Sequence, residues 1–183
     1  MPGVDNHAGE DLVEGCRAGR LEAFERLYEQ TGPRMKSIAA NLLGNTEDAE
    51  DAVQETFLKV YRGAGGFQGA SAVSTWAFRI LLNTCYDAMR RRRRHPEDAV
   101  SEGLNLRLAS GADHPLRLSL EKAVRQLPER ERAAFLLVEV EGFSHREAAE
   151  VLDVPEGTSR TLLFSARGRL KRALAPISAG GTA

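Results

Sequence analysis

The sequence predicts an all-α protein made of two small helical domains that are joined by a flexible linker. Apolar residues recur at spacings of three and four through most of the 183 residues, and no segment shows the strict alternation typical of strands. Glycine and proline fall mainly between these periodic segments. Residues 96–115 lack periodicity and are rich in small and polar residues, so they are too few and too polar to bury a core of their own.

The domain boundaries follow from this change of character. We expect a first domain at residues 10–95, the linker at 96–115 and a second domain at 116–175. Residues 1–9 and 176–183 are expected to be flexible termini.

The first domain begins with two expected helices. One covers about residues 10–31 and is weakened at Gly19, because glycine is a poor helix former. Pro33 suits the first turn of the next helix, which should end before Gly44.

A third and a fourth helix complete the first domain. Asn45 or Thr46 can cap the third helix, which runs to about residue 62. The fourth helix should begin near Ser71 or Ser74, after a Gly-rich loop, and end at Pro96. The third helix carries an apolar stripe that would face the core, formed by Ala49, Ala52, Val53, Phe57, Val60 and Tyr61.

The second domain also reads as a series of helices. Leu120, Val124 and Leu127 continue one apolar stripe, and a further helix should run from Pro128 to Gly142. The remaining signals indicate a helix-turn-helix, although an ordinary helical hairpin has the same periodicity. They are a capping box at Ser144 and Glu147, a short helix at 144–152, the turn DVPEG, and a basic helix at 157–174 that stops before Pro176.

The composition argues against several functional classes. No apolar run approaches the roughly 18 residues of a membrane span, and the N-terminus lacks the apolar segment of a secretion signal, so we expect a cytoplasmic protein. Cys16 and Cys85 lie far apart and the histidines are scattered, so no metal site is expected. No catalytic motif and no phosphate-binding loop is present, and we expect neither an enzyme nor a bound cofactor.

Charge is strongly segregated, although the formal net charge is only −1. Residues 45–55 hold only acidic charges, residues 157–172 hold only basic ones, and residues 90–94 are five consecutive arginines. Such a chain can meet a basic partner and a polyanion through different surfaces. Because its total charge is balanced, we expect the free chain to bind DNA weakly.

Three helix faces could carry these interactions. Acids at 48, 51 and 55 share one face of the third helix, which is either a solvated face or a docking site for a basic partner. The fourth helix has a polar stripe that can reach bases or phosphates, formed by Thr75, Arg79, Asn83, Asp87 and Arg90. The last helix presents Arg160, Phe164, Arg167 and Lys171 opposite its apolar stripe of Leu162, Leu163, Ala166, Leu170 and Leu174.

Two long segments resemble a known family. The stretches DAEDAVQETFLKVYRGAGGFQG and STWAFRILLNTCYDAMRRRRR are similar to conserved region 2 of bacterial RNA polymerase sigma factors of the extracytoplasmic-function (ECF) group. The stretch LPERERAAFLLVEVEGFSHREAAEVLDVPEGTSRTLLFSARGRLKRAL resembles their region 4. The similarity covers about residues 10–95 and 116–175, with the two blocks in the family's order and spacing.

The resemblance implies a sigma subunit that binds core RNA polymerase and directs it to promoters. It implies contacts with the β′ clamp helices and the β flap, binding to promoter DNA, and an anti-sigma factor as a further partner. The positions that match the family's contact with the clamp helices are Asp48, Asp51, Gln54 and Glu55.

The resemblance also implies two DNA-reading surfaces. The loop and long helix would open the −10 element and hold a flipped base, through Phe67, Gln68, Ser74, Thr75, Trp76, Arg79, Asn83, Arg90 and Arg91. The helix-turn-helix would read the −35 element through Arg146, Glu156, Gly157, Thr158, Arg160, Thr161 and Arg167. Arg92, Arg93 and Arg94 would supply general attraction for DNA. Leu162, Phe164 and Ser165 depart from the polar and basic residues common in the family, so we expect a weak or unusual −35 preference.

Two alternatives remain at the level of the sequence. A stand-alone helix-turn-helix regulator would bind duplex DNA without polymerase, but it leaves the acidic third helix unexplained. A protein-interaction adaptor with reduced DNA binding would fit the altered last helix.

Overall fold

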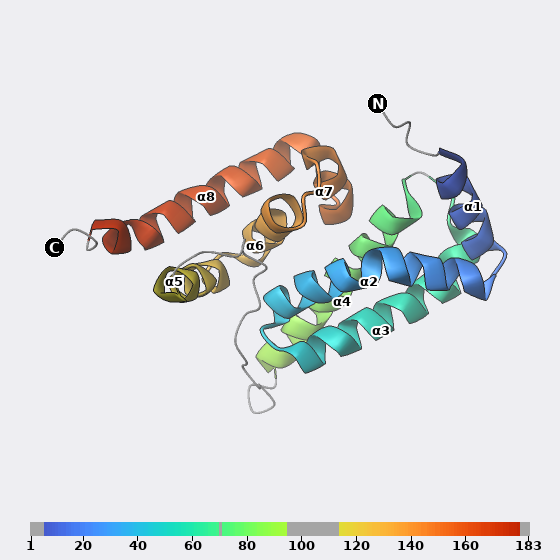
Figure 1. Cartoon of the computed structure of the whole chain (residues 1–183), viewed down its shortest axis with the longest axis horizontal. Coiled ribbons are helices and arrows are strands. Elements are labelled where there is room, and N and C mark those ends of the chain that lie inside the picture. Colours follow the sequence, from blue (N-terminus) through green and yellow to red (C-terminus); the bar gives the residue numbers. More distant parts are fainter. Residues whose placement is uncertain (1–5, 70, 95–113, 180–183) are drawn as a thin grey trace.

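The structure is a computed structural model that describes residues 6–69, 71–94 and 114–179 (Figure 1). The described residues form helices and turns without any strand, which confirms the all-α class. Most of the expected linker, residues 96–113, lies outside the described residues, as do both ends of the chain. The α-helices are α1 (Asn6–Arg17), α2 (Leu21–Leu43), α3 (Thr46–Gly63), α4 (Val73–Arg94), α5 (His114–Arg125), α6 (Glu129–Phe135), α7 (His145–Leu152) and α8 (Glu156–Ala179).

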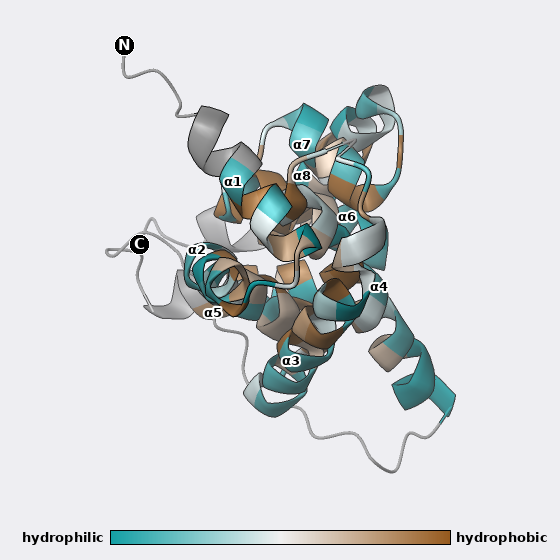
Figure 2. Ribbon diagram, turned by 90° about the vertical axis from the view of Figure 1, so that its right-hand side faces the viewer, coloured by the Kyte–Doolittle hydropathy of each residue, from teal (hydrophilic) through white to brown (hydrophobic). Residues whose placement is uncertain are grey.

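The helices form two groups that pack against each other. Helices α1–α4 make one group and α5–α8 the other, and α4 lies between α2 and α3 on one side and α7 on the other (Figure 1). Apolar residues face inward between the helices and polar residues cover the outside, as Figure 2 shows. The buried apolar side chains of both groups form one continuous cluster.

The first two helices differ from the expected ones. Gly19 adopts a φ of +70° and breaks the expected helix into α1 and α2, because glycine enters this left-handed region without a steric cost. Pro33 lies inside α2 and does not begin a new helix, so that expectation was wrong. A proline inside a helix costs about 3 kcal/mol. The burial of Phe24 and Leu27 before it and of Met35 and Ile38 after it, at about 1.5–3 kcal/mol each, outweighs that cost.

Helices α3 and α4 begin and end close to the expected residues. The Asn45 side chain accepts a hydrogen bond of 2.7 Å from the backbone N–H of Asp48, which confirms the predicted cap of α3. The expected core stripe of α3 is correct except at its end. Tyr61 is 56% exposed and packs against Phe24 at the surface, with ring centroids 5.0 Å apart.

The helix-turn-helix is formed by α7, the turn after it, and α8. The capping box at Ser144 and Glu147 is present, and Gly142 ends the preceding π-helical segment η3 (Leu136–Val140) with a φ of +73°. Asp153 ends α7 in the left-handed conformation, with a φ of +55°. Helix α8 continues past Pro176 to Ala179, so its expected end before that proline was wrong.

The capping box makes the stability of this segment dependent on pH. Hydrogen bonds from the side chain and the backbone of Ser144 lower the pKa of Glu147 from its ordinary value of 4.5. A carboxyl with a lowered pKa in the folded state stabilises the fold fully above its unfolded pKa, and this contribution disappears as the pH falls through the folded value.

We therefore predict that Glu147→Gln lowers the free energy of unfolding at pH 7 by about 0.5–1 kcal/mol, and by less at pH 3. Urea unfolding at both pH values measures this difference, with Glu25→Gln as a control at an exposed glutamate of α2. An equal loss of stability at both pH values would contradict the role of the carboxylate.

Candidate nucleic-acid and protein interfaces

The exposed side of α3 combines acidic and apolar residues. Asp51 and Gln54 are exposed, and Asp51 forms no ion pair with another described residue. Leu58, one helical turn after Gln54, is 55% exposed on the same side of the helix. The acidic face, defined as Glu47, Asp48, Asp51, Gln54 and Glu55, thus continues directly into an apolar area.

This apolar area was not foreseen from the sequence. It comprises Leu58 and Tyr61 of α3 with Leu21 and Tyr28 of α2, which are four of the six large hydrophobic side chains exposed in the described part of the chain. Tyr28 packs edge-on against Phe57, with ring centroids 5.1 Å apart. Clustered exposed apolar side chains typically mark an interaction surface. The sequence held one signal for this apolar area: Leu58 follows Asp51 by seven residues, which places both on the same side of a helix.

The arginine run is largely engaged in contacts within the chain. Arg91 lies 4.0 Å from Glu55, and Arg92 lies 3.7 Å from Asp48 and donates a 2.8 Å hydrogen bond to the carbonyl of Leu43. The remaining contacts are Arg90 with Asp87, Arg93 with Glu129 at 2.6 Å, and Arg94 with the carbonyl of Arg90. Arg92 and Arg93 therefore have structural partners in addition to the general attraction expected of them.

The loop before α4 builds a pocket. Phe67 is buried and stacks on Trp76 with centroids 4.9 Å apart, and its carbonyl accepts a 2.7 Å hydrogen bond from Arg17. Gln68 and Ser74, together with residues of α1, line a pocket of about 810 Å³ beside this stack. The pocket has room for a nucleobase, and Gln68 and Ser74 offer hydrogen-bonding groups to it.

The polar stripe of α4 is only partly exposed. Arg79 and Asn83 are exposed, whereas Thr75 is buried, which differs from its expected place on the polar surface. A second apolar stripe of α4, formed by Phe78 and Leu82, is buried on the side that meets α7. This stripe was not predicted from the sequence, although Phe78 and Leu82 lie four residues apart.

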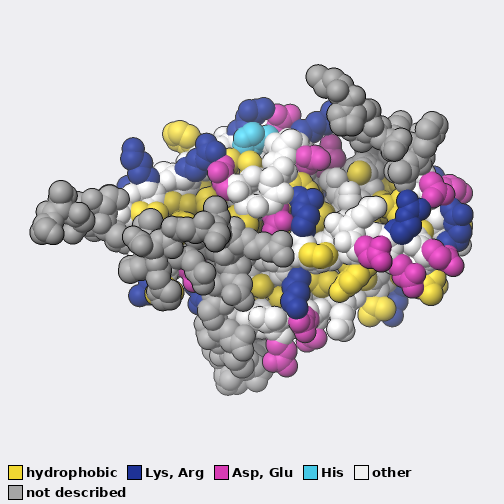
Figure 3. Space-filling model, viewed as in Figure 1, with side chains coloured by type: hydrophobic (Ala, Val, Ile, Leu, Met, Phe, Trp, Pro, Cys, Tyr) yellow, Lys and Arg dark blue, Asp and Glu magenta, His cyan; other side chains and the backbone are white. Residues whose placement is uncertain are grey.

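The helix-turn-helix presents a basic surface along α8. Arg160 pairs with Glu156 at 2.6 Å and Arg167 pairs with Glu139, so both guanidinium groups are held in place. Gly157, Thr158 and Thr161 are exposed near the start of α8, and Phe164 is 79% exposed between the arginines. Basic side chains lie along the α8 edge of the molecule, at the upper left of Figure 3. This surface suits contacts with phosphate groups.

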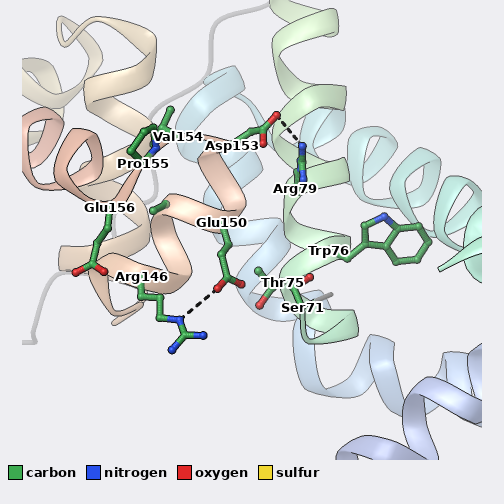
Figure 4. A pocket seen from close by; sticks show the side chains of 11 residues that line it. Ser71, Thr75, Trp76, Arg79, Arg146, Glu150, Asp153, Val154, Pro155 and Glu156 are labelled. Atoms are coloured by element: carbon green, nitrogen blue, oxygen red, sulfur yellow. Dashed lines mark ion pairs between the residues drawn. The ribbon is translucent and has the colours of Figure 1, made fainter. Parts of the chain in front are cut away.

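Residues of both helical groups that are expected to read DNA line one pocket. Thr75, Trp76 and Arg79 of α4 and Arg146 and Glu156 of the helix-turn-helix line a pocket of about 590 Å³ (Figure 4). Arg79 reaches across it to Asp153 at 2.6 Å, and Arg146 pairs with Glu150 at 3.5 Å within α7. The indole of Trp76 points away from α7.

The described residues contain no cluster of side chains suited to hold a metal ion. Both cysteines are buried thiols, and burial, with a smaller contribution from Glu55, raises the pKa of Cys85 to about 12. Such a thiol is not a nucleophile at neutral pH. None of the described helices is both long enough and apolar enough to cross a membrane.

Comparison with known proteins places both helical groups in one family. Residues 27–95 match the family model of sigma-70 region 2, and residues 117–170 match that of sigma-70 region 4. The chain is 34% identical over 170 residues to the ECF RNA polymerase sigma factor SigM of Mycobacterium tuberculosis, covering 93% of this chain and 86% of that protein. It is 31% identical over 183 residues to the RNA polymerase sigma-H factor of Pseudomonas aeruginosa, covering 92% and 94% of the two chains.

Solved structures show the same fold. The sigma factor RpoE of Bartonella quintana, in complex with the anti-sigma factor NepR, superposes with a TM-score of 0.70 at 26% identity, covering 85% of this chain and 98% of that one. CnrH in complex with the cytosolic domain of CnrY superposes with a TM-score of 0.73, covering 92% of this chain and 98% of that one, at 24% identity. The chain belongs to the extracytoplasmic-function group of bacterial RNA polymerase sigma factors.

Proposed function

We propose that this protein is a transcription-initiation sigma subunit that binds core RNA polymerase and directs it to promoters with specific −10 and −35 elements. The pocket formed by Gln68, Ser74 and α1 carries this proposal, because it lies at the start of the polar stripe of α4. If this pocket holds a flipped base, the rest of the same DNA strand would run along Arg79 and Asn83. A stand-alone regulator of duplex DNA needs no such pocket.

The two helical groups have different functions in this proposal. Residues 10–95 form the region 2 domain, which docks on polymerase and opens the −10 element. Residues 116–175 form the region 4 domain, which reads the −35 element and contacts the β flap. Residues 96–115 connect them, and residues 1–9 and 176–183 are terminal segments, although α1 and α8 extend into them.

Docking on the β′ clamp helices uses the acidic face of α3. Its carboxylates attract a basic partner, and Leu58 and Tyr61 supply apolar area that charges alone lack. Binding energy at protein interfaces usually concentrates in a few apolar or aromatic side chains surrounded by polar ones. The side of α3 that joins Asp51, Gln54 and Leu58 has this composition.

Polymerase supplies the chemistry of RNA synthesis in this proposal, and the sigma subunit supplies recognition alone, in the cytoplasm and without a cofactor. An anti-sigma factor is a further partner, as in the solved complex of the sigma factor RpoE with the anti-sigma factor NepR. The stand-alone regulator and the interaction adaptor are the competing functions.

Co-purification with core RNA polymerase, followed by run-off transcription from a matched promoter, tests the proposal. We expect stoichiometric association and promoter-dependent transcripts. DNA binding without association would favour the stand-alone regulator. Association without initiation on any promoter would favour the adaptor.

The acidic face gives a first prediction. Asp51→Arg places a cation opposite a basic partner, and like charges at an interface cost several kcal/mol. We expect at least a tenfold loss of affinity for core polymerase, measured by fluorescence anisotropy of the labelled chain. Glu25→Arg, the same change at an exposed position of α2, is the matched control. Equal affinities of the two variants would exclude the acidic face as the docking site.

The arginine run gives a second prediction. Arg90 and Arg91 remain exposed beside the polar stripe, and we assign them to phosphates of the opened strand. Arg90→Ala with Arg91→Ala should slow open-complex formation and reduce the slope of log affinity against log salt by about 0.7 for each lost contact. Permanganate footprinting at several salt concentrations measures both effects. Unchanged salt dependence with full polymerase binding would contradict the assignment.

The last helix gives a third prediction. Leu162 is half-buried and packs against the core, and Phe164 is exposed, so α8 offers fewer polar groups to bases than is common in the family. We expect a weak or unusual −35 preference. Run-off transcription on promoters with scrambled −35 elements measures it, and strong dependence on a G/A-rich consensus would disprove it.

A further inference from the structure

Helix α1 reaches the loop before α4 through one side chain, Arg17. Its Nε donates a 2.7 Å hydrogen bond to the carbonyl oxygen of Phe67, 50 residues further along the chain. Its Nη2 passes beside Gly69, where a Cβ atom would lie 3.5 Å from this nitrogen. Gly69 has a φ of +75°, so the loop turns here in a conformation that favours glycine. Arg17 therefore contacts the loop on both sides of Gln68.

The hydrogen bond from Arg17 completes the fixation of Phe67. The N–H of Phe67 donates a 3.1 Å hydrogen bond to the carbonyl of Ala64 in the short 3-10 helix η1 (Ala64–Gly66), while its carbonyl accepts from Arg17. The Phe67 ring stacks on Trp76 with centroids 4.9 Å apart. A Cβ atom at Gly63 would lie only 3.2 Å from the indole, so Trp76 also lies against the end of α3. The position of the loop thus determines how far Trp76 is covered.

Helix α1 is itself held firmly beside α2. Leu12 and Cys16 of α1 are 5% and 2% exposed. A Cβ atom at Gly15 would come within 2.6 Å of the Cβ of Ala23, so the two helices touch at a position that accepts only glycine. Arg17 therefore acts on the loop from a well-packed support.

Helix α1 also lines the pocket of about 810 Å³ beside the stack, which we call the loop pocket. Its residues in this pocket are Leu12, Val13, Glu14 and Arg17, and Gln68 and Ser74 line the same pocket. The residues expected to open the −10 element all belong to the loop and α4, so α1 is an addition made by the structure. A preformed pocket binds more tightly than one whose walls must first be ordered.

The other contact of Arg17 does not explain its position. Arg17 lies 3.9 Å from Glu14 within α1, and the two side chains are 36% and 71% exposed. An ion pair as exposed as this contributes little to stability. The hydrogen bond to the Phe67 carbonyl is shorter and charge-assisted, so it is the stronger of the two contacts.

We propose that Arg17 is a positioning residue for promoter opening, which holds the loop at Phe67 and Gly69 so that the loop pocket is preformed for an unstacked base. This inference rests on the proposed function and adds a residue of α1 to it. Loss of Arg17 should weaken the capture of the base. It should leave the docking of α3 on polymerase and the contacts of Arg79 and Asn83 with the strand intact.

The hold on the loop is tested first in the free full-length chain. Trp76 is the only tryptophan of the sequence, and its indole points away from α7 (Figure 4), so its fluorescence reports on the loop. Arg17→Met keeps the aliphatic stem but removes the guanidinium. We expect it to raise the acrylamide quenching constant of Trp76 by about half, because Phe67 no longer stays on the indole. Arg17→Lys, which can still donate to the carbonyl, should give a smaller rise.

Arg26→Met is the matched control, because Arg26 pairs with α1 at Asp11, at 2.9 Å, rather than with the loop. It should leave the quenching constant unchanged. Circular dichroism and the melting temperature show that each variant is folded. Equal quenching constants in the folded Arg17→Met and Arg26→Met variants would overturn the inference.

The role in base capture is tested in the complex with core polymerase. Fork-junction promoter fragments carry an abasic residue at each position of the −10 element in turn. The wild-type complex should lose affinity where the captured base is missing. The Arg17→Met complex should bind the intact fragment about three- to tenfold more weakly and lose no further affinity at that position. Arg17→Lys should restore part of the lost affinity, and Arg26→Met should behave as the wild type.

The same abasic penalty in the wild type and in Arg17→Met would overturn the role of Arg17 in base capture. Equal binding of all abasic fragments by the wild type would contradict base capture itself, and with it this part of the inference. Failure of the wild type to bind core polymerase would count against the proposed sigma function alone. The quenching constants of the free chain would then still decide whether Arg17 positions the loop.

Discussion

The edge-to-face contact of Phe78 with Phe143 beneath the Arg34 guanidinium joins the two halves of this molecule, and the positions of the other interfaces depend on it. Helix α4 has three sides with different surroundings along its 22 residues. One side packs on α2 and α3, a second packs on α7, and the third carries Arg79 and Asn83. Because two sides of α4 are buried, its polar stripe is narrow and borders directly on the region 4 domain.

The oppositely charged segments form ion pairs with each other within the chain, and they also offer surfaces to partners. The arginine run at the end of α4 lies against the acidic start of α3, where Asp48 and Glu55 receive Arg92 and Arg91. These surface pairs are individually weak, at about 0–1 kcal/mol each. They nevertheless bring the cations expected to meet DNA close to the carboxylates expected to meet polymerase. A net charge of −1 is therefore compatible with both kinds of binding.

Local features of the fold could be predicted from the sequence because they depend on neighbouring residues. The Asn45 cap, the capping box at Ser144 and the core stripe of α8 are such features, and the structure confirms them. The expectations at Gly19, Pro33 and Pro176 were wrong. At these positions, local helix propensity competes with packing along the helix. The sequence alone does not show how much apolar area each side of a helix buries.

The contact between the halves could not be predicted in the same way. Phe143 is 65 residues from Phe78, and periodicity along one helix does not identify the residue that packs against it. The candidate site was therefore predicted only in part. Its residues were assigned to the correct helices, whereas the apolar area around Leu58, the burial of Thr75 and the pairing of Arg79 emerged only from the assembled structure.

The sigma function proposed for this chain requires that the acidic face of α3 contacts core polymerase. A photo-activated cross-linking residue in place of Gln54 tests this contact most directly, because Gln54 is exposed on that face. We predict cross-links to the β′ subunit from position 54, and none from the same residue placed at Glu25, an exposed position of α2. The absence of a cross-link from position 54, in a complex that initiates transcription, would contradict docking through the acidic face.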